Sequence, residues 1–283
     1  MKWQRFSFFS AILLSLILGC GHGGGGGLSE PDSTNTPPDT SGRTIQIEKI
    51  EIEEGPFIRR YDDIQNFPDE APSALIQIDK FFISKTEVTN SQYAEFLNDG
   101  NEIHYDGRMK IGIESSRYIA IRNMENHPVV WVDYENAAAF AVWAGGRLPT
   151  EAEWEKAARG IYGIIYPWGN DADGSKADLG RYPDENTLNV GTYPRGDSPY
   201  GVQDMAGSVW EWCHDWYYHY YYSTPPVVTD NPTGPELPID YLIRSIRGGS
   251  FLETLLECRC SNRNYLEPEF KAYDLGFRVA WDE

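Results

Sequence analysis

The stretch from Tyr200 to Trp216 reads YGVQDMAGSVWEWCHDW and decides the fold. It contains three tryptophans, three carboxylates and two glycines in a span that is too short for a long helix and too irregular for a plain strand. From Val209 onward the tryptophans alternate with polar residues, and this spacing is typical of a strand. We therefore predict a strand that turns its indoles inward on one face, preceded by a turn.

The same stretch places four oxygen donors close together along the chain. They are the side chain of Asp204, the backbone carbonyls of Gly207 and Val209, and the carboxylate of Glu211. Calcium prefers about six to eight oxygen ligands at roughly 2.3 to 2.6 Å in a tolerant geometry. The alternative is a tight turn in which the two acids cap local amides. Spacing alone leaves both interpretations open.

The composition indicates a loop-rich globular domain with an acidic surface. Aromatic residues make up 14% of the 283-residue chain, which also holds 27 glycines and 18 prolines. A formal net charge of −19 argues against nucleic-acid or acidic-lipid partners, because phosphate groups would be repelled. The charge is compatible with metal binding, with basic partners or with solubility alone.

The N-terminus has the layout of a secretory signal. Lys2 and Arg5 precede a mostly apolar run, Phe6–Leu18, that is too short to span a membrane as a helix. The run ends in Ile17-Leu18-Gly19-Cys20, which resembles the lipobox of bacterial lipoproteins. We expect a signal peptide over residues 1–19, lipidation of Cys20 and a lipid anchor in the bacterial cell envelope. The alternative is an ordinary signal that is cleaved nearby.

The remainder divides into a tether and one domain. Residues 20–44 are rich in Gly, Ser and Pro and have few apolar side chains to offset the entropy of ordering, so we predict a flexible tether. The domain covers residues 45–283. Within it we predict strands at 45–58, ended by Gly55-Pro56, and at 74–83, 118–121, 247–251 and 275–281, and helices at 90–98, 135–143 and 150–160.

The order of these elements favours an α+β domain. Strand-helix-strand repeats for a parallel sheet are lacking, so the early strands must pair with the late ones and bring the two ends of the domain together. The late strands bracket a loop that contains Cys258 and Cys260. Two arginines, Arg247 and Arg278, are expected to pair with buried acids, as structural arginines often do.

Six motifs occur in order between residues 45 and 281: Glu87-Val88-Thr89-Asn90, Gly146-Arg147-Leu148-Pro149-Thr150-Glu151-Ala152-Glu153-Trp154-Glu155, Pro167-Trp168-Gly169-Asn170, Gly207-Ser208-Val209-Trp210-Glu211-Trp212, Arg247-Gly248-Gly249-Ser250 and Leu275-Gly276-Phe277-Arg278. Together they resemble the formylglycine-generating enzyme family, also called the sulfatase-modifying factor domain. That resemblance implies a variant of the C-type lectin fold, with mixed helices around a small twisted antiparallel sheet and much irregular loop.

The resemblance also implies structural calcium. The family's ligands correspond to the side chain of Asp204, the carbonyls of Gly207 and Val209, and Glu211, with Asp204 standing where the enzyme has asparagine. A second family calcium site would begin at Asp178 and Leu179. The loop that should complete that second site, within residues 180–190, is shortened here.

The family's oxidase chemistry is not expected in this chain. The enzyme converts a cysteine of a sulfatase peptide to formylglycine with copper held by two cysteines after the Arg-Gly-Gly-Ser motif. Glu253 takes the place of the first cysteine and Cys258 that of the second. Soft thiolates select Cu(I), and a carboxylate opposite one thiolate is a poor substitute. If the protein is an enzyme after all, Cys258 and Ser250 are the catalytic candidates.

The remaining cysteines suggest at most one disulfide. The resemblance aligns Cys260 with a family cysteine whose partner position holds Ala158, so that bridge is lost. Cys258 and Cys260 would point to opposite faces if they lay on a strand. With Cys20 lipidated, three cysteines remain, and an odd number leaves one thiol free or pairs it between chains. We hypothesise a bridge between Cys213 and Cys258.

A run of tyrosines follows the tryptophan stretch: Tyr217, Tyr218, Tyr220, Tyr221 and Tyr222. Tyrosine offers a large contact area at low entropic cost, so the run would suit a platform for a peptide or a glycan. The alternative is that half of the rings pack inward and half shield a loop.

Two functions of different class are compatible with these residues. The first is a lipid-anchored binding or assembly module of the cell envelope that recognises a peptide, a glycan or a partner protein. It would contact the membrane through its lipid alone and would bind no nucleic acid. The second is an enzyme that oxidises a protein cysteine through Cys258 or Cys260. The sequence favours the first.

Overall fold

The computed structural model describes residues 45–59, 67–182, 186–223 and 229–283. All of them belong to one compact unit, Pro38–Glu283. The predicted signal peptide, Cys20 and the whole of the predicted tether lie outside the described residues. In the part that is described, no helix has both the length and the apolar character that a membrane crossing requires.

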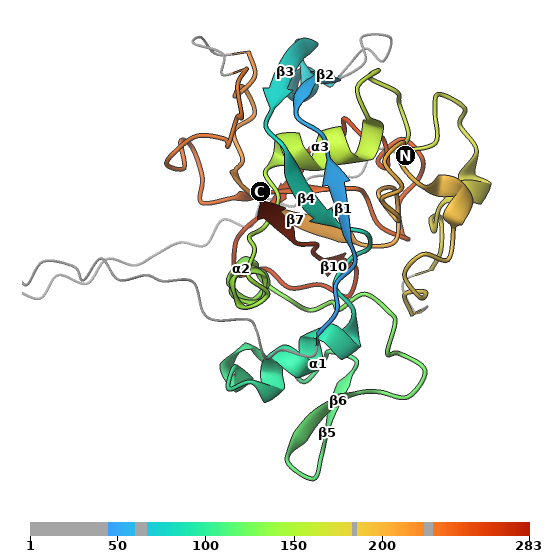
Figure 1. Ribbon diagram of the computed structural model, residues 1–283, viewed down its shortest axis with the longest axis vertical. Helices are drawn as coiled ribbons and strands as arrows, with labels where there is room; N and C mark the ends of the chain where they lie inside the picture. Colours follow the sequence, from blue (N-terminus) through green and yellow to red (C-terminus); the bar gives the residue numbers. More distant parts are fainter. Residues whose placement is uncertain (1–44, 60–66, 183–185, 224–228) are drawn as a thin grey trace, which may run out of the picture. The chain divides into compact units, whose positions relative to one another are not determined.

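The domain is α+β, as predicted, with three α-helices, small sheets and much loop among the described residues (Figure 1). The helices are α1 (Asn90–Asn98), α2 (Tyr134–Trp143) and α3 (Glu151–Arg159). The strands are β1 (Lys49–Ile52), β2 (Gly55–Arg59), β3 (Ala74–Ile78), β4 (Phe81–Ser84), β5 (Ile111–Glu114), β6 (Arg117–Ala120), β7 (Trp210–Trp216), β8 (Arg244–Arg247), β9 (Asn264–Leu266), β10 (Leu275–Gly276) and β11 (Ala280–Asp282).

The early and late strands pair, as the element order predicted. Strand β4 lies between β1 and β11 and is antiparallel to both, so both ends of the described domain lie in one three-stranded sheet. A second sheet has the order β10-β7-β8-β9. Its β10–β7 contact is a short parallel pair and its other pairs are antiparallel.

Several predicted strands were too long. The predicted strand at 45–58 is two strands, and Gly55 begins β2 rather than ending a strand. Likewise, the strand predicted at 74–83 is two strands, β3 and β4. Strand β3 pairs with β2, whereas β4 pairs with β1 in another sheet. Strand β8 ends at Arg247, because Gly248 and Gly249 have φ values of 97° and 75° that a strand does not allow. The predicted strand at 275–281 is divided into β10 and β11.

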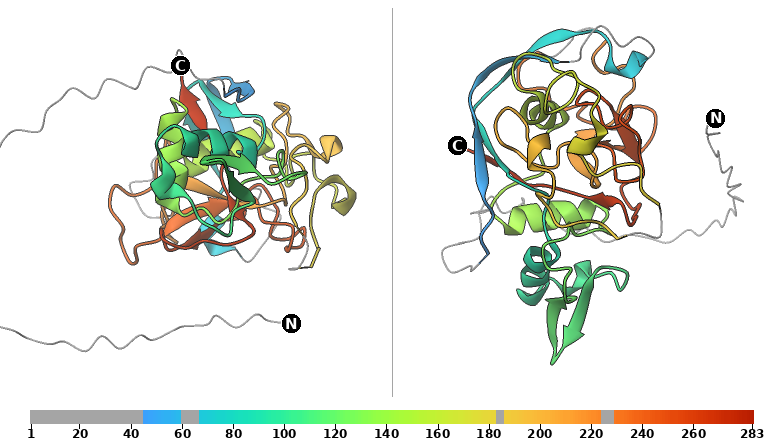
Figure 2. Two further views of the ribbon diagram at one scale, coloured as in Figure 1. Left: turned by 90° about the horizontal axis from the view of Figure 1, so that it is seen from below. Right: turned by 90° about the vertical axis from the view of Figure 1, so that its right-hand side faces the viewer.

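The three helices lie within one or two residues of their predicted bounds, since each has a local start signal. Thr89 with Gln92 and Thr150 with Glu153 form complete capping boxes at α1 and α3. Asp133 caps α2 by accepting a hydrogen bond from a backbone amide. The predicted strand near 118–121 is β6, and its partner β5 was not predicted. Figure 2 shows the resulting β5–β6 hairpin beside α1.

The tryptophan-rich strand β7 lies between two hydrophobic clusters. Trp210 and Trp212 pack with residues of α1 and α2, whereas Cys213 packs in a second cluster that includes Trp154. The prediction of one buried face was therefore incomplete: Glu211 and Cys213, on the other face, are also fully buried. A strand covered on both sides places its polar residues where each must find a partner.

Candidate functional site

A buried ion pair lies at the centre of the predicted calcium region. Arg278 donates from Nε to Glu211 Oε2 at 2.6 Å and from its second terminal nitrogen to Oε1 at 2.8 Å. Trp154 Nε1 donates to the same carboxylate at 2.7 Å. The expectation that Arg278 pairs with a buried acid is therefore confirmed. Arg247 does the same, with Glu155 at 2.5 Å.

The turn before β7 has an unusual backbone with three positive φ values, and at Gly207 it approaches another segment closely. Asp204, Gly207 and Ser208 have φ values of 59°, 76° and 60°. The amide of Ser208 donates to the carbonyl of Asp178 at 2.9 Å. A Cβ atom on Gly207 would lie 2.1 Å from that same carbonyl oxygen, so the turn requires glycine there.

Glu87 is the residue of this region that the sequence analysis did not single out. It is 1% exposed, and no hydrogen bond to its carboxylate oxygens satisfies the usual distance and angle limits in the described part of the chain, although the side chains of Asp204 and Ser208 lie next to it. Burial raises the pKa of Glu87 well above its ordinary value, and the negative charge of Asp204 raises it further. Burial also raises the pKa of Asp204, although the amide of Gly191 donates to it. The motif that starts at Glu87 had served only as one of the six motifs of the family resemblance.

These residues fit a hard cation in donor type and in charge. Three carboxyl groups, those of Glu87, Asp204 and Glu211, interact with one guanidinium, that of Arg278. Within the described ranges, no three His, Cys, Asp or Glu side chains form a ready-made metal-binding group. A cation here would therefore need backbone carbonyls as well, which is the set predicted with Gly207 and Val209. Oxygen-only donors with excess negative charge suit calcium.

The second predicted calcium site has a competing contact. The carboxylate of Asp178 accepts two hydrogen bonds from one terminal nitrogen of Arg181, at 2.9 and 3.1 Å. A cation at Asp178 and Leu179 would have to displace this guanidinium. Residues 183–185, in the loop that would complete the site, lie outside the described ranges.

The positions of the family's copper ligands hold one carboxylate and one protonated thiol. Cys258 is fully buried, and burial raises the pKa of its thiol, with a further rise from the charge of Glu253. A Cβ on Gly249 would lie 2.5 Å from Cys258 Sγ, so the thiol packs directly against the Arg-Gly-Gly-Ser turn. Ser250, the other catalytic candidate, donates from its hydroxyl to Asp274 at 2.9 Å.

The hypothesised Cys213–Cys258 disulfide is wrong. All three cysteines of the described chain are free and buried. Cys213 and Cys260 belong to the cluster that includes Trp154, whereas Cys258 packs in a separate small cluster with Ala177 and Ala206. Cys258 and Cys260 lie in turns rather than on a strand.

The tyrosine run is divided between buried, half-buried and exposed rings. Tyr217 is buried and donates to Asp69 at 2.9 Å, and Tyr222 is 2% exposed with the guanidinium of Arg59 3.7 Å from its ring centre. Tyr218 and Tyr221 are half-buried. Tyr220, at 53% exposed, is the one member of the run that is mostly open to solvent.

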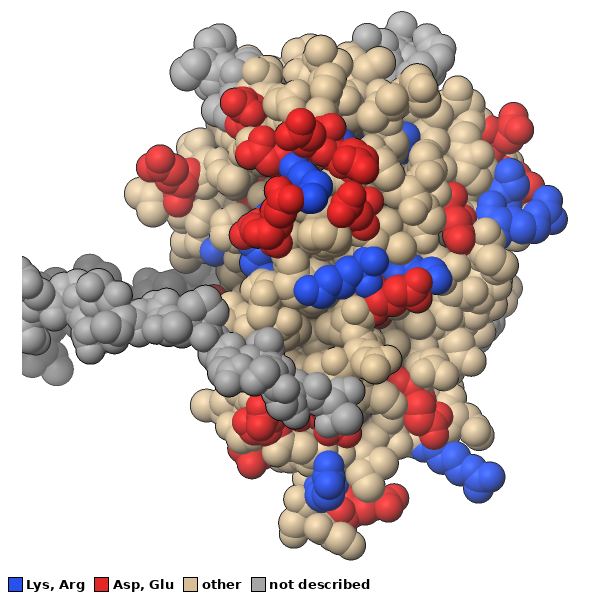
Figure 3. Space-filling model, in the orientation of Figure 1, with Lys and Arg blue, Asp and Glu red and all other residues tan. Residues whose placement is uncertain are grey.

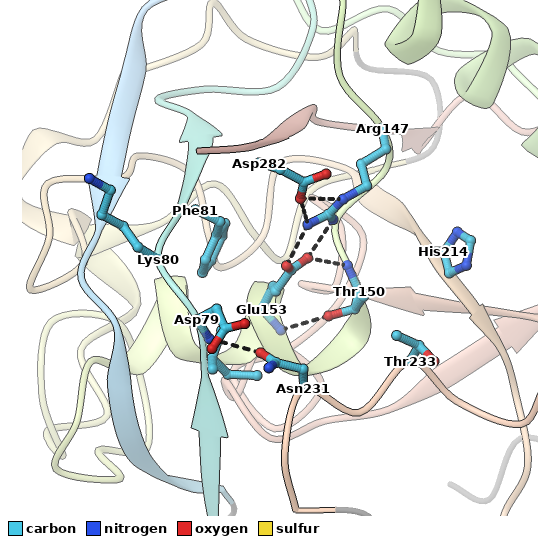
Figure 4. Close-up of a pocket in the computed structure, with 11 residues that line it drawn as sticks. Asp79, Lys80, Phe81, Arg147, Thr150, Glu153, His214, Asn231, Thr233 and Asp282 are labelled. Atoms are coloured by element: carbon cyan, nitrogen blue, oxygen red, sulfur yellow. Dashed lines mark hydrogen bonds and ion pairs between the residues drawn. The ribbon is translucent and has the colours of Figure 1, made fainter. Parts of the chain in front are cut away.

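A pocket of about 290 Å³ was not predicted, because its walls come from separate segments of the chain (Figure 4). Arg147 lies in it between two acids, 2.7 Å from Glu153 and 2.6 Å from Asp282. Acidic side chains gather over β1 to β4 (Figure 3), where Lys80 pairs with Glu283 at 2.5 Å. The pocket is lined by Ile78, Asp79, Lys80, Phe81, Arg147, Thr150, Glu153, His214, Asn231, Thr233 and Asp282.

Sequence comparison finds relatives of this domain in several proteins. Residues 35–283 match the family described as the sulfatase-modifying factor enzyme 1-like domain. The formylglycine-generating enzyme of Mus musculus is 30% identical, with 88% of this chain and 79% of that enzyme covered. A protein named serine/threonine-protein kinase Pkn1 in Chlamydia trachomatis is 38% identical over 84% of this chain. The match covers only 39% of that relative's length.

Structural comparison agrees with the fold predicted from the motifs. PvdO from Pseudomonas aeruginosa superposes with a TM-score of 0.66 at 26% identity, covering 82% of this chain and 93% of PvdO. Treponema denticola variable protein 1 superposes with a TM-score of 0.65 at 19% identity, covering 84% of this chain and 95% of that protein. At this level of identity the likeness shows the fold alone. These neighbours and the small sheets support the expected C-type lectin-like architecture. The chain belongs to the formylglycine-generating enzyme family, by its sulfatase-modifying factor enzyme 1-like domain.

Proposed function

We propose that this protein is a lipid-anchored binding or assembly module of the bacterial cell envelope, which keeps the family scaffold without its copper chemistry. The observation that carries the proposal is Glu253 at the position of the family's first copper ligand, beside the buried, protonated thiol of Cys258. Cu(I) prefers two soft thiolates, and this pair supplies a hard oxygen and a neutral sulfur.

One structural calcium ion is part of the proposal. It would be held by the side chain of Asp204, the carbonyls of Gly207 and Val209, and Glu211. When bound, the ion supplies positive charge that offsets the surplus of carboxylates around Arg278. Its role is to fix the turn ahead of β7 rather than to react with a substrate.

The proposed location rests on the N-terminal sequence. A lipid on Cys20 and a tether to residue 44 would hold the domain near a membrane through the anchor alone. The ligand would be a peptide, a glycan or another envelope protein, since the net charge of −19 disfavours nucleic acid.

Expression of the full chain with Cys20→Ser tests the anchor: we expect the wild type in the membrane fraction and the variant outside it. If the wild type and the variant are found in the membrane fraction to the same extent, the proposed lipid anchor is wrong.

The copper test separates the module from an oxidase. We expect the purified protein to bind no stoichiometric Cu(I) and to consume no oxygen with a cysteine-containing peptide. Stoichiometric Cu(I) binding with oxygen consumption by the wild type would overturn the proposal and favour an enzyme that acts on a protein cysteine.

A gain-of-function variant strengthens the copper test. Glu253→Cys restores the family's two sulfurs, so we expect it to bind Cu(I) together with Cys258. Glu257→Cys is the matched control, because it adds a thiol in the same loop at a position that is not a family ligand. If both variants bind Cu(I) equally, the added thiol alone explains the binding and the position of Glu253 has no special meaning.

A further inference from the structure

The buried carboxylate of Glu87 lacks a positively charged partner in direct contact, and the rest of the cluster does not provide one. Glu87 lies between the end of β4 and Thr89, the N-cap of α1. It is 1% exposed, and no hydrogen bond to either oxygen satisfies the usual distance and angle limits among the described residues, although the side chains of Asp204 and Ser208 lie next to it. A buried charge without a partner costs several kcal/mol, so such groups are normally paired or bind a cation.

Arg278 cannot be that partner, because its donors are already used. Its Nε and one terminal nitrogen bind Glu211. That terminal nitrogen also donates to the carbonyl of Gln203 at 3.0 Å, and the other donates to the carbonyls of Ser84 and Lys85 at 3.1 and 3.5 Å. A guanidinium has five N–H groups, and these contacts use all five. The charge of Arg278 therefore reaches Glu87 only at longer range.

Asp204 places a second negative charge next to Glu87. In the resemblance described above, asparagine stands at this position in the enzyme, so Asp204 adds a charge to the cluster. Two neighbouring carboxylates in a mostly buried site repel each other, and either a shared proton or a cation between them relieves that repulsion. The four expected calcium ligands also leave the ion short, because it prefers about six to eight oxygens.

We propose that Glu87 is a further ligand of the cation at this turn, so that one ion bridges Glu87 and Asp204. The inference rests on the calcium ion of the proposed function and adds a residue to its coordination. An ion shared in this way joins the β4–α1 connection to the turn before β7, two segments that are far apart in sequence. Calcium then stabilises the packing of the β4–α1 connection against the turn before β7, in addition to the turn itself.

Terbium luminescence tests this coordination directly. Terbium occupies calcium sites, and Trp154, which contacts Glu211, is close enough to sensitise its emission. We expect the purified wild type to bind terbium and to release it to calcium. Luminescence lifetimes in H₂O and D₂O then count the waters on the ion. In Glu87→Ala we expect about one or two additional waters and an affinity at least about tenfold lower.

The matched control is Asp274→Asn, which alters another mostly buried carboxyl group that belongs to a different contact, with Ser250. We expect its water count and affinity to equal those of the wild type. An unchanged water count and affinity in Glu87→Ala would show that Glu87 is not a ligand. If the wild type binds neither terbium nor calcium, the proposed calcium ion itself is absent, which is a different result.

Thermal unfolding distinguishes a ligand from a residue that only supports the fold. Glu87→Gln removes the unpaired charge, so we expect the cation-free variant to melt at a higher temperature than the cation-free wild type. The rise in melting temperature on adding calcium should be smaller in the variant. A variant that melts lower without calcium, or fails to fold, contradicts the proposal, because Glu87 would then contribute to stability without the ion.

Discussion

Arg278 and Glu211 form a doubly hydrogen-bonded ion pair, at 2.6 and 2.8 Å, in which both side chains are completely shielded from solvent. Arg278 belongs to the Leu-Gly-Phe-Arg motif near the C-terminal end, and Glu211 belongs to β7. Trp154 of α3 donates to the same carboxylate. One ion pair therefore connects three motifs that are widely separated in the sequence.

Removal of this guanidinium should destabilise the domain strongly. Arg278→Met leaves Glu211 buried with one donor and removes the positive charge that Glu87 and Asp204 experience. Breaking a buried pair from one side typically costs about 3 to 5 kcal/mol. Urea denaturation of wild type and variant measures the loss in the free energy of unfolding.

The control for that prediction is Arg147→Met. Arg147 also pairs with two acids, but its side chain is 32% exposed and Asp282 is 76% exposed. Water can solvate Asp282, and Glu153, which is only 10% exposed, keeps the hydrogen bond from the amide of Thr150, so we expect a loss below that of Arg278→Met. Similar losses for the two variants would show that burial does not determine the importance of these pairs.

A pair of glycine substitutions tests how closely the helix α2 exit approaches β11. A Cβ on Gly146 would lie 2.3 Å from the carbonyl oxygen of Ala280 and 2.7 Å from Trp281 Nε1. The backbone cannot move there without breaking the Arg147–Ala280 bridge. We expect Gly146→Ala to lower the free energy of unfolding by about 1 to 3 kcal/mol.

Gly112→Ala serves as the comparison, because a Cβ at Gly112 in β5 has no atom within 4 Å. Neither glycine has a φ in the left-handed region, so the two changes differ in local space rather than in backbone strain. We expect Gly112→Ala to change stability by less than about 1 kcal/mol. A loss as large as that of Gly146→Ala would contradict the steric explanation.

The helices were predictable because their signals are local. Thr89 with Gln92 and Thr150 with Glu153 lie three residues apart, and the structure contains both capping boxes. Strand ends were less predictable: an alternating pattern continues through residues 45–58 while the chain changes from one sheet to another after Ile52. Periodicity reports which face is buried, and it does not report which strand is the partner.

The candidate site shows the same limit. The tryptophan stretch and Arg278 were recognised from motifs, but Glu87 was named only as the first residue of a family motif and was given no role at the site. Its neighbour Asp204 is more than a hundred residues away, so no spacing rule connects them. The pocket around Arg147 was missed for the same reason. The motif order, which carries the family resemblance, provided the fold that local patterns alone did not.

The pH dependence of stability should reveal the buried acid Asp215. One of its oxygens accepts from the amide of Glu151 at 2.8 Å and the other has no partner among the described residues. Burial, followed by the charge of Glu151, raises the pKa of Asp215 well above its ordinary value. The folded state therefore retains a proton that the unfolded state loses, so stability falls as pH rises from about 4 towards the raised pKa.

Asp215→Asn should remove that part of the pH dependence. We expect the variant's free energy of unfolding, measured by urea denaturation across a pH series, to fall less steeply above about pH 4. Asp106→Asn is the opposite control: hydrogen bonds from Arg108 lower the pKa of Asp106 to about 2. The contribution of Asp106 to stability is fully present above the ordinary pKa of an aspartate and is lost as pH falls through about 2. Parallel pH profiles for Asp215→Asn and wild type would contradict the assignment.

Thiol chemistry provides the last test, because it addresses both the disulfide and the packing of the core. Cys213, Cys258 and Cys260 are free and buried, and burial raises the pKa of Cys260 to about 12. Only the thiolate reacts with a disulfide reagent, so shielding and a high pKa should both slow the reaction in the folded protein. We expect slow labelling without denaturant and rapid labelling of all three in denaturant. A Cys258→Ala variant should lose one thiol from the denatured count. If that substitution instead exposes an additional thiol, Cys258 was paired, and the separation of Cys213 and Cys258 into two clusters would be incorrect.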